Sequence, residues 1–69
     1  MAKWNKIYST PEFYKADIVR VALEEREIAA IIIDKADSSY NNFGEREVYV
    51  EQENTIKAIK IIKDEVHLT

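Results

Sequence analysis

Residues 28–51 read IAAIIIDKADSSYNNFGEREVYVE, and they decide the fold because they hold two strand patterns joined by a polar loop. In residues 28–34 isoleucine falls on both alternating faces, which is typical of a strand that is covered on both sides or lies in an interface. In residues 45–51 two valines alternate with a glutamate and a tyrosine, which is the pattern of a half-buried strand. We therefore predict two strands connected by residues 35–44.

A helix is expected before the first of these strands, over residues 11–26. Pro11 suits the first helical position, where its missing N–H costs nothing, and Thr10 is then the N-cap. Ser9 with Glu12 also fits a capping box, so the cap is open by one residue. One stripe has the i, i+3, i+7 spacing of a core-facing surface: Ala16, Val19 and Leu23. Further apolar residues widen this arc enough for part of it to meet a partner: Tyr14, Ile18, Val21 and Ala22.

The outer elements complete the predicted chain. A strand over residues 3–8 precedes the helix, and a second helix over residues 53–65 follows the last strand. The expected inner stripe of that second helix is Thr55, Ala58, Ile59 and Ile62. Its outer side carries three lysines that read as a solvated helix surface: Lys57, Lys60 and Lys63. Residues 66–69 are too short to count on as a fourth strand.

The order strand, helix, strand, strand, helix restricts the topology. A right-handed crossover between the first two strands leaves a gap, and the third strand returns antiparallel into it. We therefore predict one α+β domain, residues 1–69, with the sheet order 1-3-2 and both helices on one face. This is the ferredoxin-like arrangement without its last strand.

This topology leaves two surfaces uncovered, the sheet face opposite the helices and the outer edge of the first strand. Exposed apolar surface of this kind usually marks an interface or a ligand surface. We expect homo-oligomerisation, with a dimer as the simplest state, through the uncovered face, with edge pairing through residues 3–8 or 66–69 as an equally open route. The candidate oligomer face consists of Trp4, Tyr8, Ile31, Ile33 and Tyr49.

Composition limits the function classes. A chain of 69 residues buries only about 60% of the surface that its unfolded form exposes, so its stability is marginal. It has no cysteine to form a disulfide or a thiolate zinc site. Ten Lys and Arg against thirteen Asp and Glu give a net charge of −3, which argues against a nucleic-acid partner. The apolar runs are far shorter than the roughly 20 residues of a membrane helix, so we expect a cytoplasmic protein with no membrane partner.

The loop over residues 35–44 is longer than an ordinary hairpin connection, and long connections are often functional or compactly folded. It offers hydroxyl and amide groups for hydrogen bonds and two aromatic rings for stacking. The candidate ligand or partner contacts are Asp37, Ser38, Ser39, Tyr40, Asn41, Asn42, Phe43 and Gly44. In the alternative the loop packs on itself, with Asp37 in an Asx-turn and Phe43 plugging the core.

Catalytic and metal sites find little support. Asp34, Asp37, Glu45 and Glu47 crowd the ends of the loop but match no calcium-loop spacing, so no metal is expected. The single histidine, His67, lies next to the C-terminus, and a single glycine excludes a phosphate-cradling glycine loop. We expect no enzyme activity and no cofactor.

The motifs I-Y-S-T, Y-K-A-D-I-V, and D-S-S-Y-x-x-F-G-E-x-E-V-Y-V resemble a family of small bacterial domains of unknown function, named prokaryotic signal transducing proteins. The resemblance covers roughly residues 4–64, and its most specific part is the loop with the strand that follows. It implies a ferredoxin-like, GlnB-like fold and brings no catalytic residue. Members often have glycine where this chain has Glu27, at the end of the first helix.

The expected function is therefore that of a small regulatory or signal-transducing module that binds through self-association and through residues 37–44. One alternative is a structural interaction domain without a ligand. A distant third is an enzyme whose site forms at a subunit interface.

Overall fold

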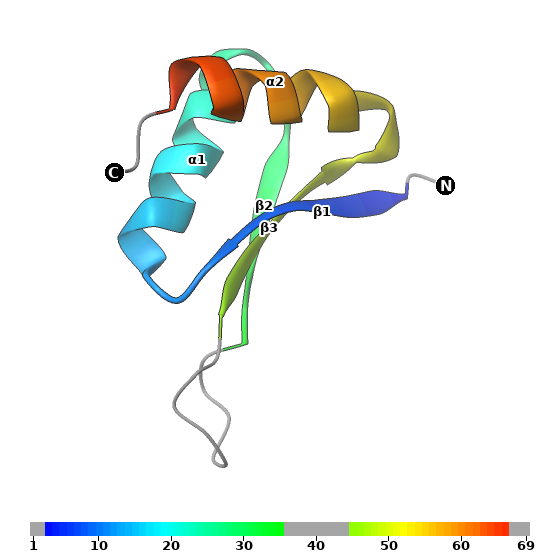
Figure 1. Ribbon diagram of the computed structural model, residues 1–69. Helices are drawn as coiled ribbons and strands as arrows, with labels where there is room; N and C mark the ends of the chain where they lie inside the picture. Colours follow the sequence, from blue (N-terminus) through cyan, green and yellow to red (C-terminus); the bar gives the residue numbers. More distant parts are fainter. Residues whose placement is uncertain (1–2, 36–44, 67–69) are drawn as a thin grey trace.

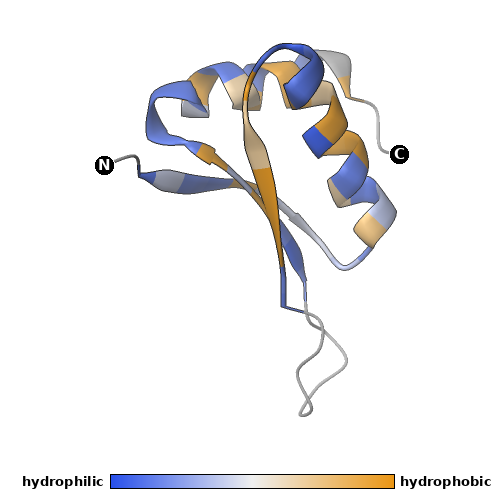
Figure 2. Ribbon diagram, turned by 180° about the vertical axis from the view of Figure 1, so that it is seen from behind, coloured by the Kyte–Doolittle hydropathy of each residue, from blue (hydrophilic) through white to orange (hydrophobic). Residues whose placement is uncertain are grey.

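The computed structural model describes residues 3–35 and 45–66 (Figure 1). Within them the elements are β1 (Trp4–Thr10), α1 (Phe13–Glu25), β2 (Ala30–Asp34), β3 (Arg46–Glu51), the 3-10 helix η1 (Gln52–Asn54) and α2 (Thr55–Glu65). In this described part the three strands form an antiparallel sheet in the order β1-β3-β2, which confirms the predicted α+β class and strand order. Both helices cover the same face of the sheet (Figures 1 and 2).

The start of α1 differs from the expectation. Thr10 is the last residue of β1, where it pairs with Arg46 and is buried, so it cannot act as the N-cap. The helix begins at Phe13 behind Glu12, which has extended backbone angles and no capping side chain. The Thr10 hydroxyl oxygen instead accepts a hydrogen bond from the Glu12 N–H at 3.2 Å. Sheet pairing therefore takes Ser9 and Thr10, the two residues that sequence reasoning offered as N-caps, and α1 begins two residues later than predicted.

The end of α1 is a Schellman motif closed by a residue other than glycine. The Ile28 N–H donates to the Leu23 carbonyl oxygen at 3.0 Å, and the Glu27 N–H donates to the Glu24 oxygen at 2.9 Å. Glu27 has φ 63°, the left-handed conformation that glycine adopts without steric cost. Leu23 and Ile28 are both buried, which supplies the hydrophobic contact that accompanies this motif.

Replacing Glu27 by glycine is expected to stabilise the protein. The left-handed conformation costs a residue with a Cβ about 1 kcal/mol or more, and glycine's greater freedom in the unfolded chain offsets part of the gain. We expect the free energy of unfolding to rise by up to about 1 kcal/mol, or a Tm increase of up to about 8 °C. Urea and thermal unfolding measure it. The same substitution at Glu25, inside the helix, should lower stability, and a loss in both variants would refute the assignment of strain to Glu27.

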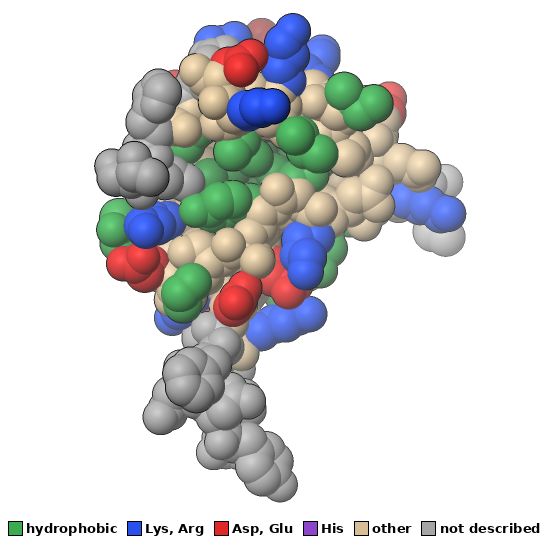
Figure 3. Space-filling model, viewed as in Figure 1, with side chains coloured by type: hydrophobic (Ala, Val, Ile, Leu, Met, Phe, Trp, Pro, Cys, Tyr) green, Lys and Arg blue, Asp and Glu red, His purple; other side chains and the backbone are tan. Residues whose placement is uncertain are grey.

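The core lies between the sheet and the helices. The predicted stripe of α1 is confirmed, since Ala16, Val19 and Leu23 are fully buried. They form one buried cluster with Val48 and Val50, the fully buried valines of β3. Hydrophobic side chains are also visible between α2 and β1 in Figure 3. The core therefore reaches the surface on this side of the molecule.

The buried side of α2 differs in part from the expected stripe. Ala58 is fully buried as predicted, but Ile59 is 48% exposed and Ile61 is buried in its place. The reason is that α2 contacts α1 as well as β1 and β3, so its buried side is turned toward the neighbouring helix. The lysines 57, 60 and 63 are exposed, as expected.

Candidate interaction surface

The predicted contact residues Asp37 to Gly44 lie outside the described residues, but the strand ends that hold this segment are described. The Lys35 N–H donates a hydrogen bond to the Glu45 carbonyl oxygen at 2.9 Å. Next to it, Arg46 Nε lies 3.4 Å from Asp34 Oδ1, and the Arg46 guanidinium also donates to the carbonyl oxygen of Pro11. The ends of β2 and β3 on either side of residues 36–44 are therefore joined by a backbone hydrogen bond and by an ion pair.

The sheet face opposite the helices is defined by the strand register. Trp4 pairs with Glu51, Lys6 with Tyr49, Ile31 with Tyr49 and Ile33 with Glu47. Directly opposed residues of antiparallel strands share a face. We call the open face the surface formed by Trp4, Lys6, Ser9, Ile31, Ile33, Glu47, Tyr49 and Glu51.

Exposure shows that this face is uncovered in the single chain. Trp4 is 40% exposed, Ile31 is 41% exposed and Ile33 is 39% exposed. Tyr49 is half-buried in the middle of the face. The structure thus brings together four of the five residues that the sequence assigned to the oligomer face.

Tyr8 is the exception, and its predicted position is corrected. The register shifts between Lys6 and Tyr8, so that Tyr8 pairs with Val48 and points to the helix-covered side. Ile7 and Tyr8 both pack against the core. A β-bulge inserts one residue and reverses the alternation beyond it, and simple alternation along the strand does not reveal the insertion.

Glu47 is the centre of a charge network on the open face. Although ionisable, it is only 9% exposed. Its Oε1 accepts a hydrogen bond from the Tyr49 hydroxyl at 2.9 Å and lies 3.1 Å from Lys35 Nζ, while Oε2 lies 3.5 Å from Lys6 Nζ. These contacts join all three strands of the described sheet, because Lys6 comes from β1 and Lys35 follows β2.

The electrostatic consequences follow from these contacts. The Tyr49 hydroxyl and the Lys35 ammonium hold the pKa of Glu47 below its usual range, against the opposing effect of burial. The hydrogen bond to Glu47 and the negative charge of Glu47 raise the pKa of Lys35 above its usual value. The Glu47 carboxylate and the Lys35 ammonium group are therefore both charged at neutral pH. Sequence reasoning noted Glu47 only as a loop-end carboxylate, since Lys6 is brought to it by strand pairing.

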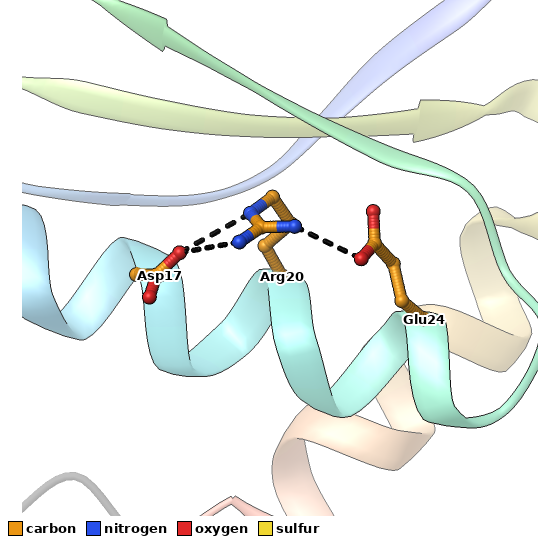
Figure 4. Close-up of polar contacts among 3 residues, drawn as sticks. All are labelled: Asp17, Arg20 and Glu24. Carbon is orange, nitrogen blue, oxygen red and sulfur yellow. Dashed lines mark hydrogen bonds and ion pairs between the residues drawn. The ribbon is translucent and has the colours of Figure 1, made fainter.

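A second charge network lies on α1. Arg20 Nη2 lies 2.6 Å from Asp17 Oδ1, and Nη1 lies 2.9 Å from Glu24 Oε1 (Figure 4). These carboxylates raise the pKa of the Arg20 guanidinium, with the Asp17 hydrogen bond as the largest cause. Pairs at i, i+3 and i, i+4 stabilise a helix modestly. We assign this network to helix stability.

Other kinds of site are not formed by the described residues. Among residues 3–35 and 45–66, no three His, Cys, Asp or Glu side chains are grouped to hold a metal ion. No helix in that part of the chain is long and apolar enough to cross a membrane.

Comparison of the chain with models of protein families, with curated proteins and with solved structures returns no match. The resemblance to the prokaryotic signal transducing proteins therefore stays a prediction.

Proposed function

We propose that this protein is a small, non-enzymatic cytoplasmic binding module of the regulatory type, which self-associates through the open face. In this proposal the fold is the ferredoxin-like, GlnB-like arrangement without its last strand, and residues 37–44 contact a ligand or a protein partner. The observation that carries the proposal is an exposed sheet face with Trp4, Ile31 and Ile33, whose buried carboxylate, Glu47, is already paired within the protomer.

The charge network is what makes the open face suited to an interface. An ion loses its hydration when a partner covers it, and that cost is large unless the ion is paired and hydrogen-bonded. Glu47 already has its three partners within the protomer. A second copy can therefore cover Ile31 and Ile33 without leaving the Glu47 carboxylate unpaired.

The free edge of β1 is less suited to pairing with a second copy. Its register is broken between Lys6 and Tyr8, and Lys6 stands near the middle of the strand. Bulges and lysines are devices by which edge strands avoid adding another strand. Between the free edge of β1 and the open face, the open face is therefore favoured.

Two double variants test the proposal with matched exposure. Ile31→Thr with Ile33→Thr should shift a concentration-dependent dimer to monomer in light scattering or sedimentation, because it removes apolar area from the open face. Ile18→Gln with Val21→Gln should leave the dimer intact, although these α1 residues are 45% and 40% exposed, as much as the two on β2. The fluorescence of Trp4, the only tryptophan, should shift to the blue on association in the second variant but not in the first.

Two controls complete this experiment. Circular dichroism verifies that both variants keep their helices and strands. A chain in which a two-residue turn replaces residues 36–44 should remain dimeric, since the open face does not include these residues. A wild-type chain that stays monomeric at every concentration, or dissociation caused only by the α1 variant, would rule out the open face as the interface.

A further inference from the structure

A hollow lies between the end of α1 and the outer side of α2. Its volume of about 340 Å³ falls within the range of about 300 to 1,000 Å³ of small-molecule pockets. We call it the α1–α2 hollow, and its lining residues are Arg26, Lys57, Lys60, Ile61 and Asp64. In Figure 2 the turn after α1 passes in front of α2, and residues of both segments line the hollow. The hollow lies in the helix layer, away from the open face.

The hollow brings together three cationic side chains, Arg26, Lys57 and Lys60, and one carboxylate, Asp64. The cations of the sheet and of α1 each lie within ion-pair distance of a carboxylate: Lys6, Lys15, Arg20, Lys35 and Arg46. Lys57 and Lys60 have no such pair with any described residue, and the same holds for Lys3 and Lys63, so what distinguishes Lys57 and Lys60 is that they lie with Arg26 around one hollow. A chain of net charge −3 therefore gathers positive charge in a concave place, where the field is concentrated and an anion is attracted.

The backbone holds the arginine of this hollow in place. Arg26 is the C-cap residue of α1, and its N–H donates to the Leu23 carbonyl oxygen at 3.0 Å. The next residue, Glu27, has the left-handed φ of 63° that turns the chain back toward the core. Strained backbone positions cluster at functional sites, where the surrounding structure enforces them. Here the strained turn fixes the position from which Arg26 reaches the hollow.

We propose that the α1–α2 hollow binds a phosphate monoester of a small hydroxyl-bearing molecule. The planar Arg26 guanidinium matches two phosphate oxygens at once, and the lysine ammonium groups add two point charges. Asp64 accepts a hydrogen bond from a hydroxyl of the same ligand, and its charge repels a second phosphate. Ile61 offers the apolar contact. This site is independent of the proposed self-association, because it shares no residue with the open face.

The binding test uses two probes, inorganic phosphate and ribose 5-phosphate, at constant ionic strength. Both should produce saturable shifts of the backbone amide NMR signals of Arg26, Glu27, Lys57 and Lys60. Ribose 5-phosphate should bind more tightly, because only its hydroxyls can donate to Asp64. Shifts that grow linearly without saturation would overturn the proposal.

Charge-matched variants separate a site from general electrostatic attraction. Lys57→Gln with Lys60→Gln should weaken ribose 5-phosphate binding about tenfold or more, since charged hydrogen bonds are lost. Lys3→Gln with Lys63→Gln removes the same charge outside the hollow and should change affinity by less than about threefold, because exposed charges at a distance are screened. Equal losses of affinity in both variants would show that the ligand is held by general electrostatic attraction and would refute a defined site in the hollow.

Asp64→Asn tests the hydroxyl contact. It should tighten inorganic phosphate binding, because a repelling charge is removed. It should also reduce the preference for ribose 5-phosphate, since an ionised acceptor makes the stronger hydrogen bond. An unchanged preference would remove Asp64 from the site and with it the hydroxyl-bearing ligand.

Discussion

Replacing Leu23 by alanine is expected to leave much of this protein unfolded. Leu23 is fully buried and is the largest of the fully buried side chains. Truncating a buried leucine to alanine costs about 2 to 5 kcal/mol, from lost burial and from the cavity left behind. A 69-residue domain has only roughly 3 to 10 kcal/mol of stability in total. The variant therefore loses a large share of the free energy of unfolding.

Urea unfolding followed by circular dichroism measures this loss. The matched control is Ile56→Ala, which truncates another aliphatic residue on a helix but at a position that is 83% exposed. That change should stay within about 0.5 kcal/mol of the wild type. Comparable effects of the two substitutions would mean that the core is not centred on α1. Leu23 also accepts the Schellman hydrogen bond through its backbone carbonyl oxygen. Alanine keeps that carbonyl, so the test alters the side chain alone.

Periodicity made the central part of the fold predictable. The stripe through Ala16, Val19 and Leu23 repeats at helical spacing, and Val48 and Val50 repeat at strand spacing. These positions are fully buried because the stripe on the helix and the stripe on the strand face each other in the core. The order of the strands followed from chain connectivity and from the handedness of the crossover.

Features that depend on pairing between distant segments were not predictable in the same way. The bulge that turns Tyr8 inward is set by its register with β3, 40 residues later (Tyr8 to Val48). The ion-pair partners of Glu47, Lys6 and Lys35, come from two other segments of the chain, so the spacing of residues around Glu47 does not indicate them. The left-handed Glu27 is suggested only by the glycine of resembling proteins, since the local sequence holds no glycine at the helix end.

Substituting Glu47 by glutamine is expected to affect both stability and self-association. Glutamine keeps the size and can still accept the Tyr49 hydrogen bond, but it loses the charge that holds Lys6 and Lys35. The two ammonium groups are then uncompensated on the open face, and two such faces repel each other. At neutral pH we expect a lower Tm by a few degrees and a shift from dimer to monomer.

The dependence on pH gives the sharper test. The pKa of Glu47 is lower in the folded protein than the ordinary value of about 4.3, so its contribution is present above that pH and is lost as pH falls through the folded pKa. The pKa of Lys35 is raised, so its contribution is present below about 10.4 and is lost as pH rises through the folded pKa. Between about pH 5 and 10, the wild type should therefore exceed the Glu47→Gln variant in Tm by its largest margin.

Below the folded pKa of Glu47 this margin should close, because a protonated glutamic acid and a glutamine are both neutral and similar in size. The matched control is Glu45→Gln, which removes one negative charge from the same strand end without removing an ion pair between described residues. Its Tm should run parallel to that of the wild type over the whole pH range. A margin between wild type and Glu47→Gln that persists unchanged in acid would show that the carboxylate charge is not what holds the three strand segments together. Loss of the dimer in Glu45→Gln would show that net charge alone controls association. If the margin closes and only Glu47→Gln dissociates, the compensated carboxylate both holds the sheet together and allows its open face to be covered.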